Sequence, residues 1–276
     1  MFADYHVHTE FSDDSVYPME QVIKDAIALG MNEICFTDHV DYGIKEDWDC
    51  GHPIVYRGKE PLANVDYPRY FAKVEELRHI YGEQITVKAG LEFGMQMHTI
   101  PQYRALLEKY PLDFVILSVH QVEDQEFWTQ DFQRNRSQKE YNERYYEEML
   151  KLVKSYQDYS VLGHMDLIVR YDEKGVYPFE KIEEVVSEIL KTVIADGKGI
   201  ELNTSYRRYG LNDTTPSMDI LIRYRQLGGE IITIGSDSHA PAHLGAGIEE
   251  AKRLLESLGF RFFCTYEKGK PFYHSL

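Results

Sequence analysis

Short apolar runs alternate with amphipathic segments along the chain. About seven runs are almost wholly apolar and end in polar residues, at positions 2–7, 34–37, 85–91, 114–119, 160–162, 200–202 and 231–234. Segments with apolar residues at helical spacing separate them, at positions 19–29, 67–81, 100–109, 139–156, 179–195, 218–227 and 248–258. Runs without polar alternation are typical of strands covered on both faces. The pattern therefore predicts parallel strands joined by helical crossovers.

The number of runs favours a closed or nearly closed α/β barrel. About seven strands over 276 residues suit a barrel better than an open sheet, and single barrel domains reach this length. A doubly wound sheet is the alternative, but no Gly-rich phosphate loop follows the first run. Residues 40–66 interrupt the alternation of apolar runs and amphipathic segments, because they contain Gly, Pro, Trp and alternating charges. We therefore expect one domain over residues 1–276, with a long loop at 40–66 that lines the site.

Net charge indicates which classes of partner to expect, and the cysteine content indicates the cellular compartment. The net charge is -16, from 46 acidic and 30 basic residues, which argues against binding to nucleic-acid backbones. An anionic small substrate remains compatible, because bound cations can reverse the local sign of charge. Cys35, Cys50 and Cys264 form no CxxC pair, as is typical of a reducing compartment. With neither a signal-peptide pattern nor a membrane-length apolar run, we expect a soluble, cytoplasmic protein.

Side chains that can bind metals fall at the ends of the apolar runs. His6 and His8 are two apart, so on a strand they point to one face, and neutral histidine is a common transition-metal ligand. The other runs end in or near His39, Glu92, His120, His164, Asp237 and His239. In a barrel these ends meet at the catalytic face. For any single residue, a hydrogen-bonded side chain at a strand end is the simpler interpretation; the whole set indicates a metal site.

The composition of this set predicts both the ions and the chemistry. Histidines with shared carboxylates suit Zn, Mn or Fe rather than Mg or Ca. Six histidines with Asp14, Glu92 and Asp237 are too many for one tetrahedral ion, so we expect two or three ions, with Glu92 as a bridging ligand. Such a site generates hydroxide near neutral pH and holds both oxygens of an in-line displacement at phosphorus.

Six segments resemble, in order and nearly from end to end, the motifs of the polymerase-and-histidinol-phosphatase (PHP) superfamily. They are Asp-Tyr-His-Val-His-Thr at 4–9, Thr-Asp-His at 37–39, Gly-Leu-Glu at 90–92, Ser-Val-His at 118–120, Gly-His-Met-Asp at 163–166 and Gly-Ser-Asp-Ser-His at 235–239. The resemblance implies a distorted (β/α)7 TIM-like barrel with a trinuclear metal site. It implies three ligand sets, namely His6, His8, Glu92 and Asp237; Glu92, His120 and His164; and Asp14, His39 and His239. Because Asp14 stands where the family often has His, the third ion is open between Fe, Mn and Zn.

Two further segments resemble the stand-alone histidinol-phosphate phosphatases of this superfamily. They are Gly163-His-Met-Asp-Leu-Ile-Val-Arg170 and Glu201-Leu-Asn-Thr-Ser-Tyr-Arg-Arg208. A planar guanidinium matches two phosphoryl oxygens, so Arg170 and Arg208 are predicted phosphate ligands. Tyr206 stands where the family usually has Gly, so Arg207 is an alternative to Arg208. His243 is expected either to line the pocket or to pack within its loop.

The predicted metal site and this resemblance together imply a metal-dependent phosphomonoesterase that hydrolyses L-histidinol phosphate to L-histidinol, a step of histidine biosynthesis. Glu92 and Asp237 are the predicted catalytic residues, with the proton handled by Asp237 or by a metal-binding histidine. The alternatives are a phosphodiesterase or nuclease of the same superfamily, a phosphatase for another small phosphoester, and a non-catalytic metal-binding module. We expect a small phosphate ester as partner and neither nucleic acid nor membrane. The oligomeric state stays open.

Overall fold

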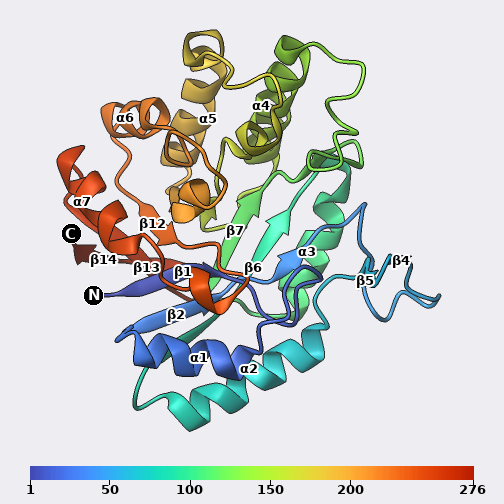
Figure 1. Cartoon of the computed structure of the whole chain (residues 1–276), viewed down its shortest axis with the longest axis vertical. Helices are drawn as coiled ribbons and strands as arrows, with labels where there is room; N and C mark the ends of the chain where they lie inside the picture. Colours follow the sequence, from blue (N-terminus) through green and yellow to red (C-terminus); the bar gives the residue numbers. More distant parts are fainter.

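The computed structural model describes residues 1–276 and has a barrel of parallel strands at its centre (Figure 1). Its strands follow one another in the order β1 (Ala3–Val7), β2 (Glu33–Phe36), β6 (Thr86–Gly94), β7 (Phe114–Ser118), β10 (Val161–Leu162), β11 (Gly199–Asn203) and β12 (Ile232–Gly235). The segment after β12 meets β1, where Ser238 N donates to His6 O (3.1 Å) and His8 N donates to Ser238 O (2.8 Å). These contacts nearly close the sheet, and the expected distorted (β/α)7 barrel is confirmed.

Helices connect the strands and cover the outside of the barrel (Figure 1). They are α1 (Met19–Ala28), α2 (Tyr67–Tyr81), α3 (Ile100–Lys109), α4 (Gln138–Ser155), α5 (Glu183–Ala195), α6 (Met218–Gln226) and α7 (Ile248–Ser257). Local signals set several of their starts. Ser137 and Glu140 form a capping box at α4, and Asp66 accepts from Arg69 N at α2. The helix expected over 179–195 differs, because its first turn is a separate 3₁₀ helix, Phe179–Lys181.

The strands are buried on both faces, which explains their continuous apolar character. Every residue of β1, β2, β7, β11 and β12 is buried. They belong to one hydrophobic core of 70 residues that extends from the barrel interior to the inner faces of the helices. Since this core takes in the strands and the helices alike, it gives the strand ends a rigid support.

A C-terminal hairpin closes the N-terminal end of the barrel. It consists of β13 (Phe262–Glu267) and β14 (Lys270–Ser275), which pair antiparallel. Tyr266 N donates to the hydroxyl of Tyr5 (2.7 Å), and the Tyr266 ring lies 5.0 Å from that of Phe114. Because Phe114 begins β7, the hairpin seals the end of the barrel opposite the expected site.

Three short strand pairings lie at the C-terminal ends of the barrel strands. Strand β3 (His39–Val40) pairs with the end of β6, so that His39 lies opposite Glu92. The expected long loop contains the hairpin of β4 (Tyr56–Arg57) and β5 (Glu60–Pro61), which projects from the body in Figure 1. A second hairpin, β8 (Gln121–Val122) and β9 (Gln125–Glu126), follows β7. Arg57 joins the two hairpins through two bonds to Glu126, of 2.8 and 3.2 Å.

None of the helices combines the length and the apolar character required to cross a bilayer.

Candidate metal centre

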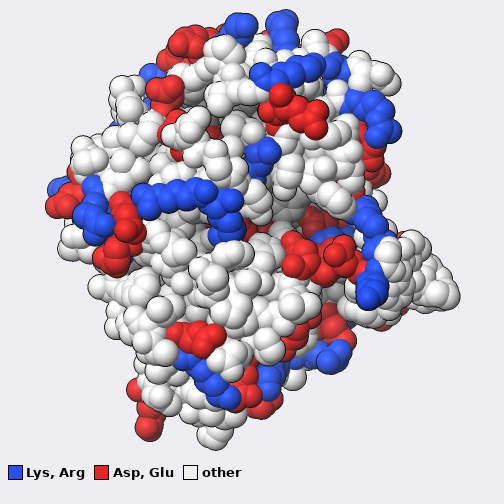
Figure 2. All heavy atoms as spheres, viewed as in Figure 1, with Lys and Arg blue, Asp and Glu red and all other residues white.

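A cavity of about 350 Å³ opens at the C-terminal ends of the strands. In the view of Figure 2 a hollow lies between the barrel and the projecting hairpin, with acidic and basic side chains at its edge. Seven of the nine predicted metal ligands line this cavity, namely Asp14, His39, Glu92, His120, His164, Asp237 and His239. His6 and His8 are fully buried next to them. The structure therefore brings together all nine side chains that the sequence singled out.

Glu92 lies at the centre of the cluster, and its two carboxylate oxygens face two different groups of histidines. Its Oε2 lies 3.0 Å from His6 Nε2, 3.5 Å from His8 Nε2 and 3.1 Å from His39 Nδ1. Its Oε1 lies 3.1 Å from His120 Nε2 and 2.8 Å from the Nε2 of His164. A carboxylate with imidazoles on both oxygens has the arrangement of a bridging metal ligand.

The set formed by His6, His8, Glu92 and Asp237 has the dimensions of a metal site. Asp237 Oδ1 lies 3.8 Å from His6 Nε2 and 3.6 Å from His8 Nε2, and the corresponding distances from Glu92 Oε2 are 3.0 and 3.5 Å. Two donors bound at about 2.0–2.1 Å to a tetrahedral Zn²⁺ lie about 3.3 Å apart. His8 Nε2 is buried and has no hydrogen-bond partner. A cation at the centre of these four donors would satisfy it, so the residues fit the metal.

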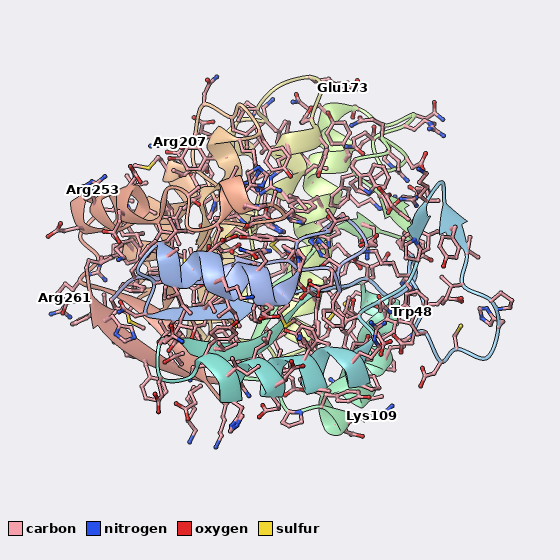
Figure 3. All side chains as sticks on the ribbon, turned by 60° about the horizontal axis from the view of Figure 1, so that its bottom comes forward. Trp48, Lys109, Glu173, Arg207, Arg253 and Arg261 are labelled. Atoms are coloured by element: carbon pink, nitrogen blue, oxygen red, sulfur yellow. The ribbon has the colours of Figure 1, made fainter.

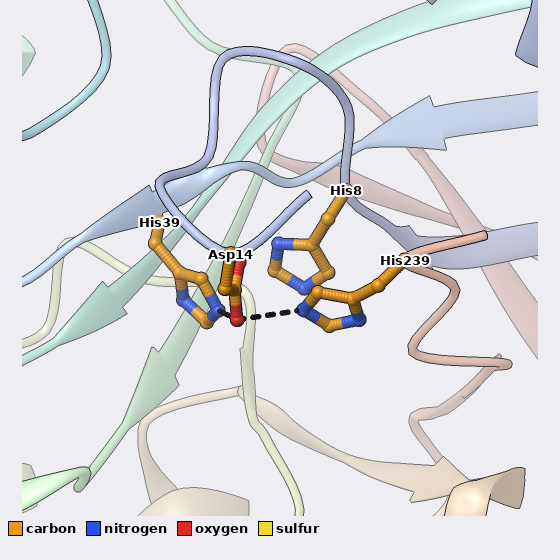
Figure 4. A group of neighbouring side chains, drawn as sticks. All are labelled: His8, Asp14, His39 and His239. Carbon is orange, nitrogen blue, oxygen red and sulfur yellow. Dashed lines mark ion pairs between the residues drawn. The ribbon is translucent and has the colours of Figure 1, made fainter. Parts of the chain in front are cut away.

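A second group surrounds Asp14, as Figure 4 shows. Asp14 Oδ2 lies 3.5 Å from His39 Nε2 and 3.1 Å from His239 Nε2. The His8 ring stacks on the His239 ring, with centroids 4.0 Å apart. His8 therefore lies between this group and the first one, although the resemblance assigned it to the first alone.

Burial and neighbouring charges favour the metal-binding form of key ligands. Burial alone would raise the pKa of Glu92, but the histidines around it, His6 foremost, outweigh burial and hold the pKa well below its usual range. Burial lowers the pKa of His8 well below its usual range, and the nearby His239 and His39 lower it further. An ionised carboxylate and a neutral imidazole are the states that bind transition metals.

Hydrogen bonds from outside the ligand set orient the rings. Glu201 Oε1 lies 2.5 Å from His6 Nδ1, and its Oε2 accepts from the backbone N–H of His164 (2.9 Å). Asp41 Oδ1 lies 2.7 Å from His120 Nδ1. Such partners fix the tautomer and orientation of metal-binding histidines. The sequence reasoning missed both roles, although a lone carboxylate within the apolar strand β11 was a usable signal for Glu201.

Two glycines leave room for these contacts. A Cβ at Gly94 would lie 1.8 Å from Asp41 Oδ1 and 2.6 Å from His120 Nδ1. A Cβ at Gly235 would lie 2.2 Å from the Cβ of His6 and 2.6 Å from Glu201 Oε1. The close approach of ligands and their supporting carboxylates therefore depends on the absence of a side chain at both positions.

Arg170 is the predicted phosphate ligand that lines the cavity. It belongs to the 3₁₀ helix Leu167–Tyr171, which follows β10. Its guanidinium is buried, 3.0 Å from Asp237 Oδ2, and lies over the Tyr209 ring at 4.2 Å. Its Nε has no partner within the protein. Nη2 is occupied by Asn203, Ser205 and Asp237, so the donor capacity that is left next to the predicted metal ligands is that of Nη1.

The other predicted substrate contacts lie outside the cavity lining. Arg208 donates to the backbone oxygens of Ser236 (3.3 Å) and Asp237 (2.7 Å), so it holds the loop that carries a ligand. Arg207 is exposed, bonds Tyr206 and lies at the surface in Figure 3. His243 is half-buried near Arg208, and burial together with that arginine lowers its pKa. The structure therefore brings Arg170 to the cavity lining, but none of Arg207, Arg208 and His243.

Comparisons with known proteins agree with this site. The PHP domain family matches residues 4–205. A histidinol-phosphatase of Lactococcus lactis subsp. lactis (strain IL1403) is 30% identical over 271 residues, which span 97% of this chain and 95% of the relative. A probable histidinol-phosphatase of Clostridium acetobutylicum is 28% identical, over 95% of each chain.

A solved structure extends the comparison to three dimensions. It is the crystal structure of the Lactococcus lactis histidinol phosphate phosphatase complexed with Zn, L-histidinol and phosphate. It matches with a TM-score of 0.84 and 29% identity, over 98% of both chains. The family match covers more than half of the sequence, and the fold match covers nearly all of it. This chain belongs to the PHP domain family.

Proposed function

We propose that this chain hydrolyses L-histidinol phosphate to L-histidinol and phosphate, a step of histidine biosynthesis. The observation that carries the proposal is the position of Glu92, whose two oxygens face separate groups of histidines on the floor of a cavity. One similar protein bears the name histidinol-phosphatase and a second the name probable histidinol-phosphatase, and the solved neighbour holds L-histidinol and phosphate. Together they favour a phosphomonoester as the substrate class.

The nine predicted ligands would hold two or three transition-metal ions, with Zn, Mn and Fe as the candidates. Glu92 would bridge, with His6, His8 and Asp237 on one side and His120 and His164 on the other. When bound, the ions supply a hydroxide for attack on phosphorus and neutralise the phosphoryl charge. The Zn of the solved neighbour supports this class of metal.

The chain's own residues would orient the phosphate and move the proton. Arg170 presents a guanidinium at the cavity wall, where its planar donors match phosphoryl oxygens. Asp237 lies between the histidines His6 and His8 and the guanidinium of Arg170. Its carboxylate is therefore placed to hold the proton of the attacking hydroxide or of the leaving group. The buried strand ends exclude bulk water from the site and so strengthen these interactions.

The outer part of the cavity suits a cationic, aromatic leaving group. Arg57, Glu60, Glu126 and Trp128 come from the two hairpins and line this part. Glu126 is paired with Arg57, whose guanidinium lies 4.7 Å from the centroid of the Trp128 ring. The Glu60 carboxylate is therefore the match for the amine of histidinol, and the exposed part of the Trp128 ring can pack against an imidazole. The cavity volume of about 350 Å³ and the net charge of -16 favour a small phosphate ester over a nucleic acid. For such an enzyme we retain the expectation of a cytoplasmic location.

A phosphate-release panel tests the proposal. The metal-loaded protein would be assayed with histidinol phosphate, other small phosphomonoesters, a dinucleotide and single-stranded DNA. We expect kcat/KM to be highest for histidinol phosphate and the diesters to be inert. The Glu92→Gln variant is the matched control. A higher kcat/KM for a diester would favour the nuclease alternative, and an equal response to all monoesters would contradict the assigned substrate.

A further inference from the structure

Lys45 is buried in the wall of the cavity, and the proposed reaction gives it no task. Its side chain is only 8% exposed. Its Nζ lies 2.6 Å from Asp13 Oδ1 and 2.7 Å from Asp41 Oδ2. A buried ammonium is costly unless charges and hydrogen bonds compensate it, and two carboxylates do so here. Two of the three N–H donors of the ammonium are therefore used within the protein.

The carboxylates of Asp13 and Asp41 each lie next to a predicted metal ligand. Asp13 precedes Asp14 in the chain, and the Asp14 side chain is 47% exposed, which makes it the least enclosed of the ligands. On the other side, Asp41 Oδ1 lies 2.7 Å from His120 Nδ1. The ammonium therefore joins the loop that carries Asp14 to the carboxylate that orients His120.

The Asp41 side of this connection is rigid. Asp41 N donates to Asn64 Oδ1 (2.9 Å), and Lys45 N donates to Asp41 O (2.8 Å) within one turn. Gly94 leaves no space on the far side, since a Cβ there would lie 1.8 Å from Asp41 Oδ1. Asp41 and Lys45 are thus a fixed base that contacts Asp13 through the ammonium. The loop is also held on either side of Asp13 and Asp14, where Ser12 Oγ donates to Asp38 Oδ1 (2.7 Å) and Ser15 Oγ donates to the backbone oxygen of His239 (3.2 Å).

We propose that Lys45 is a positioning residue of the metal centre, which holds Asp14 in place to complete the ligand group of Asp14, His39 and His239. The inference rests on the proposed function only in taking this group as a metal site. Without the ammonium, the carboxylates of Asp13 and Asp41 lose the cation between them and repel each other. The loop then moves outward and takes Asp14 with it.

Metal content tests the role independently of turnover. Wild type, Lys45→Met and Lys45→Arg would be loaded with Mn or Zn, dialysed against graded chelator and measured for bound metal by mass spectrometry. We expect Lys45→Met to lose one ion at a chelator concentration about 10–100-fold lower than wild type, and the remaining ions to be retained. Lys45→Arg keeps the charge and should restore part of the affinity. Equal retention by Lys45→Met and wild type would overturn the proposal.

Two further variants separate positioning from general stability. Asp13→Asn weakens the bond between Lys45 and the loop but leaves the Lys45–Asp41 pair, so the same ion should be lost. If Lys45→Met fails to fold, the metal content of Asp13→Asn tests the proposal in its place. Lys24→Met breaks the exposed pair of Lys24 with Glu20 and should leave metal content unchanged. A lower melting temperature with full metal content in Asp13→Asn would also contradict positioning. If wild type binds the ions but releases no phosphate, the proposed function fails while this test still stands.

Discussion

The two ends of the barrel both bury polar side chains, but they satisfy them in different ways. At the N-terminal end, the Tyr5 hydroxyl donates to Glu33 and accepts from the backbone N–H of Tyr266. The rings of Tyr5 and Phe114 pack edge to face, with centroids 4.9 Å apart. The protein pairs these groups within itself, and the hairpin β13–β14 covers them.

At the C-terminal end, carboxylates pair with His6 Nδ1 and His120 Nδ1, but other buried ring nitrogens lack partners. His8 Nε2, His39 Nδ1 and His164 Nδ1 have no hydrogen-bond partner. Buried polar groups in native proteins are nearly always paired, so the nitrogens of His8 and His39, which lie 3.5 and 3.1 Å from the same Glu92 oxygen, indicate a cation. The closed end therefore satisfies its polar groups within the protein, whereas the open end leaves nitrogens that the predicted metal ions would satisfy.

The largest expected effect is the loss of turnover in Glu92→Gln. A neutral amide keeps the shape of the side chain but cannot bridge two groups of histidines as a carboxylate does. We expect phosphate release to fall by about 10³-fold or more, with far-UV circular dichroism unchanged. Full activity in this variant would refute the bridging role.

A smaller loss of metal affinity is expected for Glu201→Gln. The amide still has an oxygen that can accept from His164 N, but it no longer provides the charge beside His6 Nδ1. Loss of such an orienting partner typically weakens metal binding about 10–100-fold. Chelator titration measures the change. Glu33→Gln, at the closed end, is the matched control and should bind metal like wild type.

At the closed end, Tyr5→Phe should change stability and leave catalysis unchanged. It removes the hydroxyl that bonds Glu33 and Tyr266 N, so two buried groups lose a partner. We expect the free energy of unfolding to fall by about 1–3 kcal/mol, as measured by urea denaturation. A drop in kcat without a change in stability would contradict the separation of the two ends.

The smallest expected effect is a pH dependence at Glu33. Burial raises the pKa of Glu33 above its usual value. A raised pKa in the folded state means that the contribution of Glu33 to stability is present at low pH and is lost as pH rises through that pKa. The unfolding free energy of wild type minus that of Glu33→Gln should therefore decrease as the pH rises above the usual pKa of a glutamate, about 4.3. An increase over this range would contradict the assignment.

Much of this contrast was predictable from local sequence. Predicted ligands such as His8, Glu92 and His120 directly follow an apolar run, and parallel strands bring such ends to one face. The sequence reasoning did not find the partners that orient them, because the bond between Glu201 and His6 spans 195 positions. No periodicity within one segment indicates a contact of that range. Lys45 was missed for the same reason, since only the folded loop brings it to Asp13.

The arginines show a second limit of sequence reasoning. Arg207 ends the 3₁₀ helix Thr204–Arg207, and Arg208 follows it. Successive residues in such a turn point about 120° apart, so two neighbours face different surroundings. Arg208 bonds the backbone of the Asp237 loop, whereas Arg207 is exposed. The segment has the composition of a phosphate site, but the exact turn decides which guanidinium faces inward.

Metal removal and refilling test the central claim most directly. The purified protein would be stripped with a chelator and then titrated with Zn or Mn, while bound metal and phosphate release from histidinol phosphate are followed together. We expect the stripped protein to be inactive and the activity to return in step with occupancy, reaching a plateau only after more than one equivalent. Full activity of the metal-free protein, or a plateau at one ion, would contradict a centre built around a bridging Glu92.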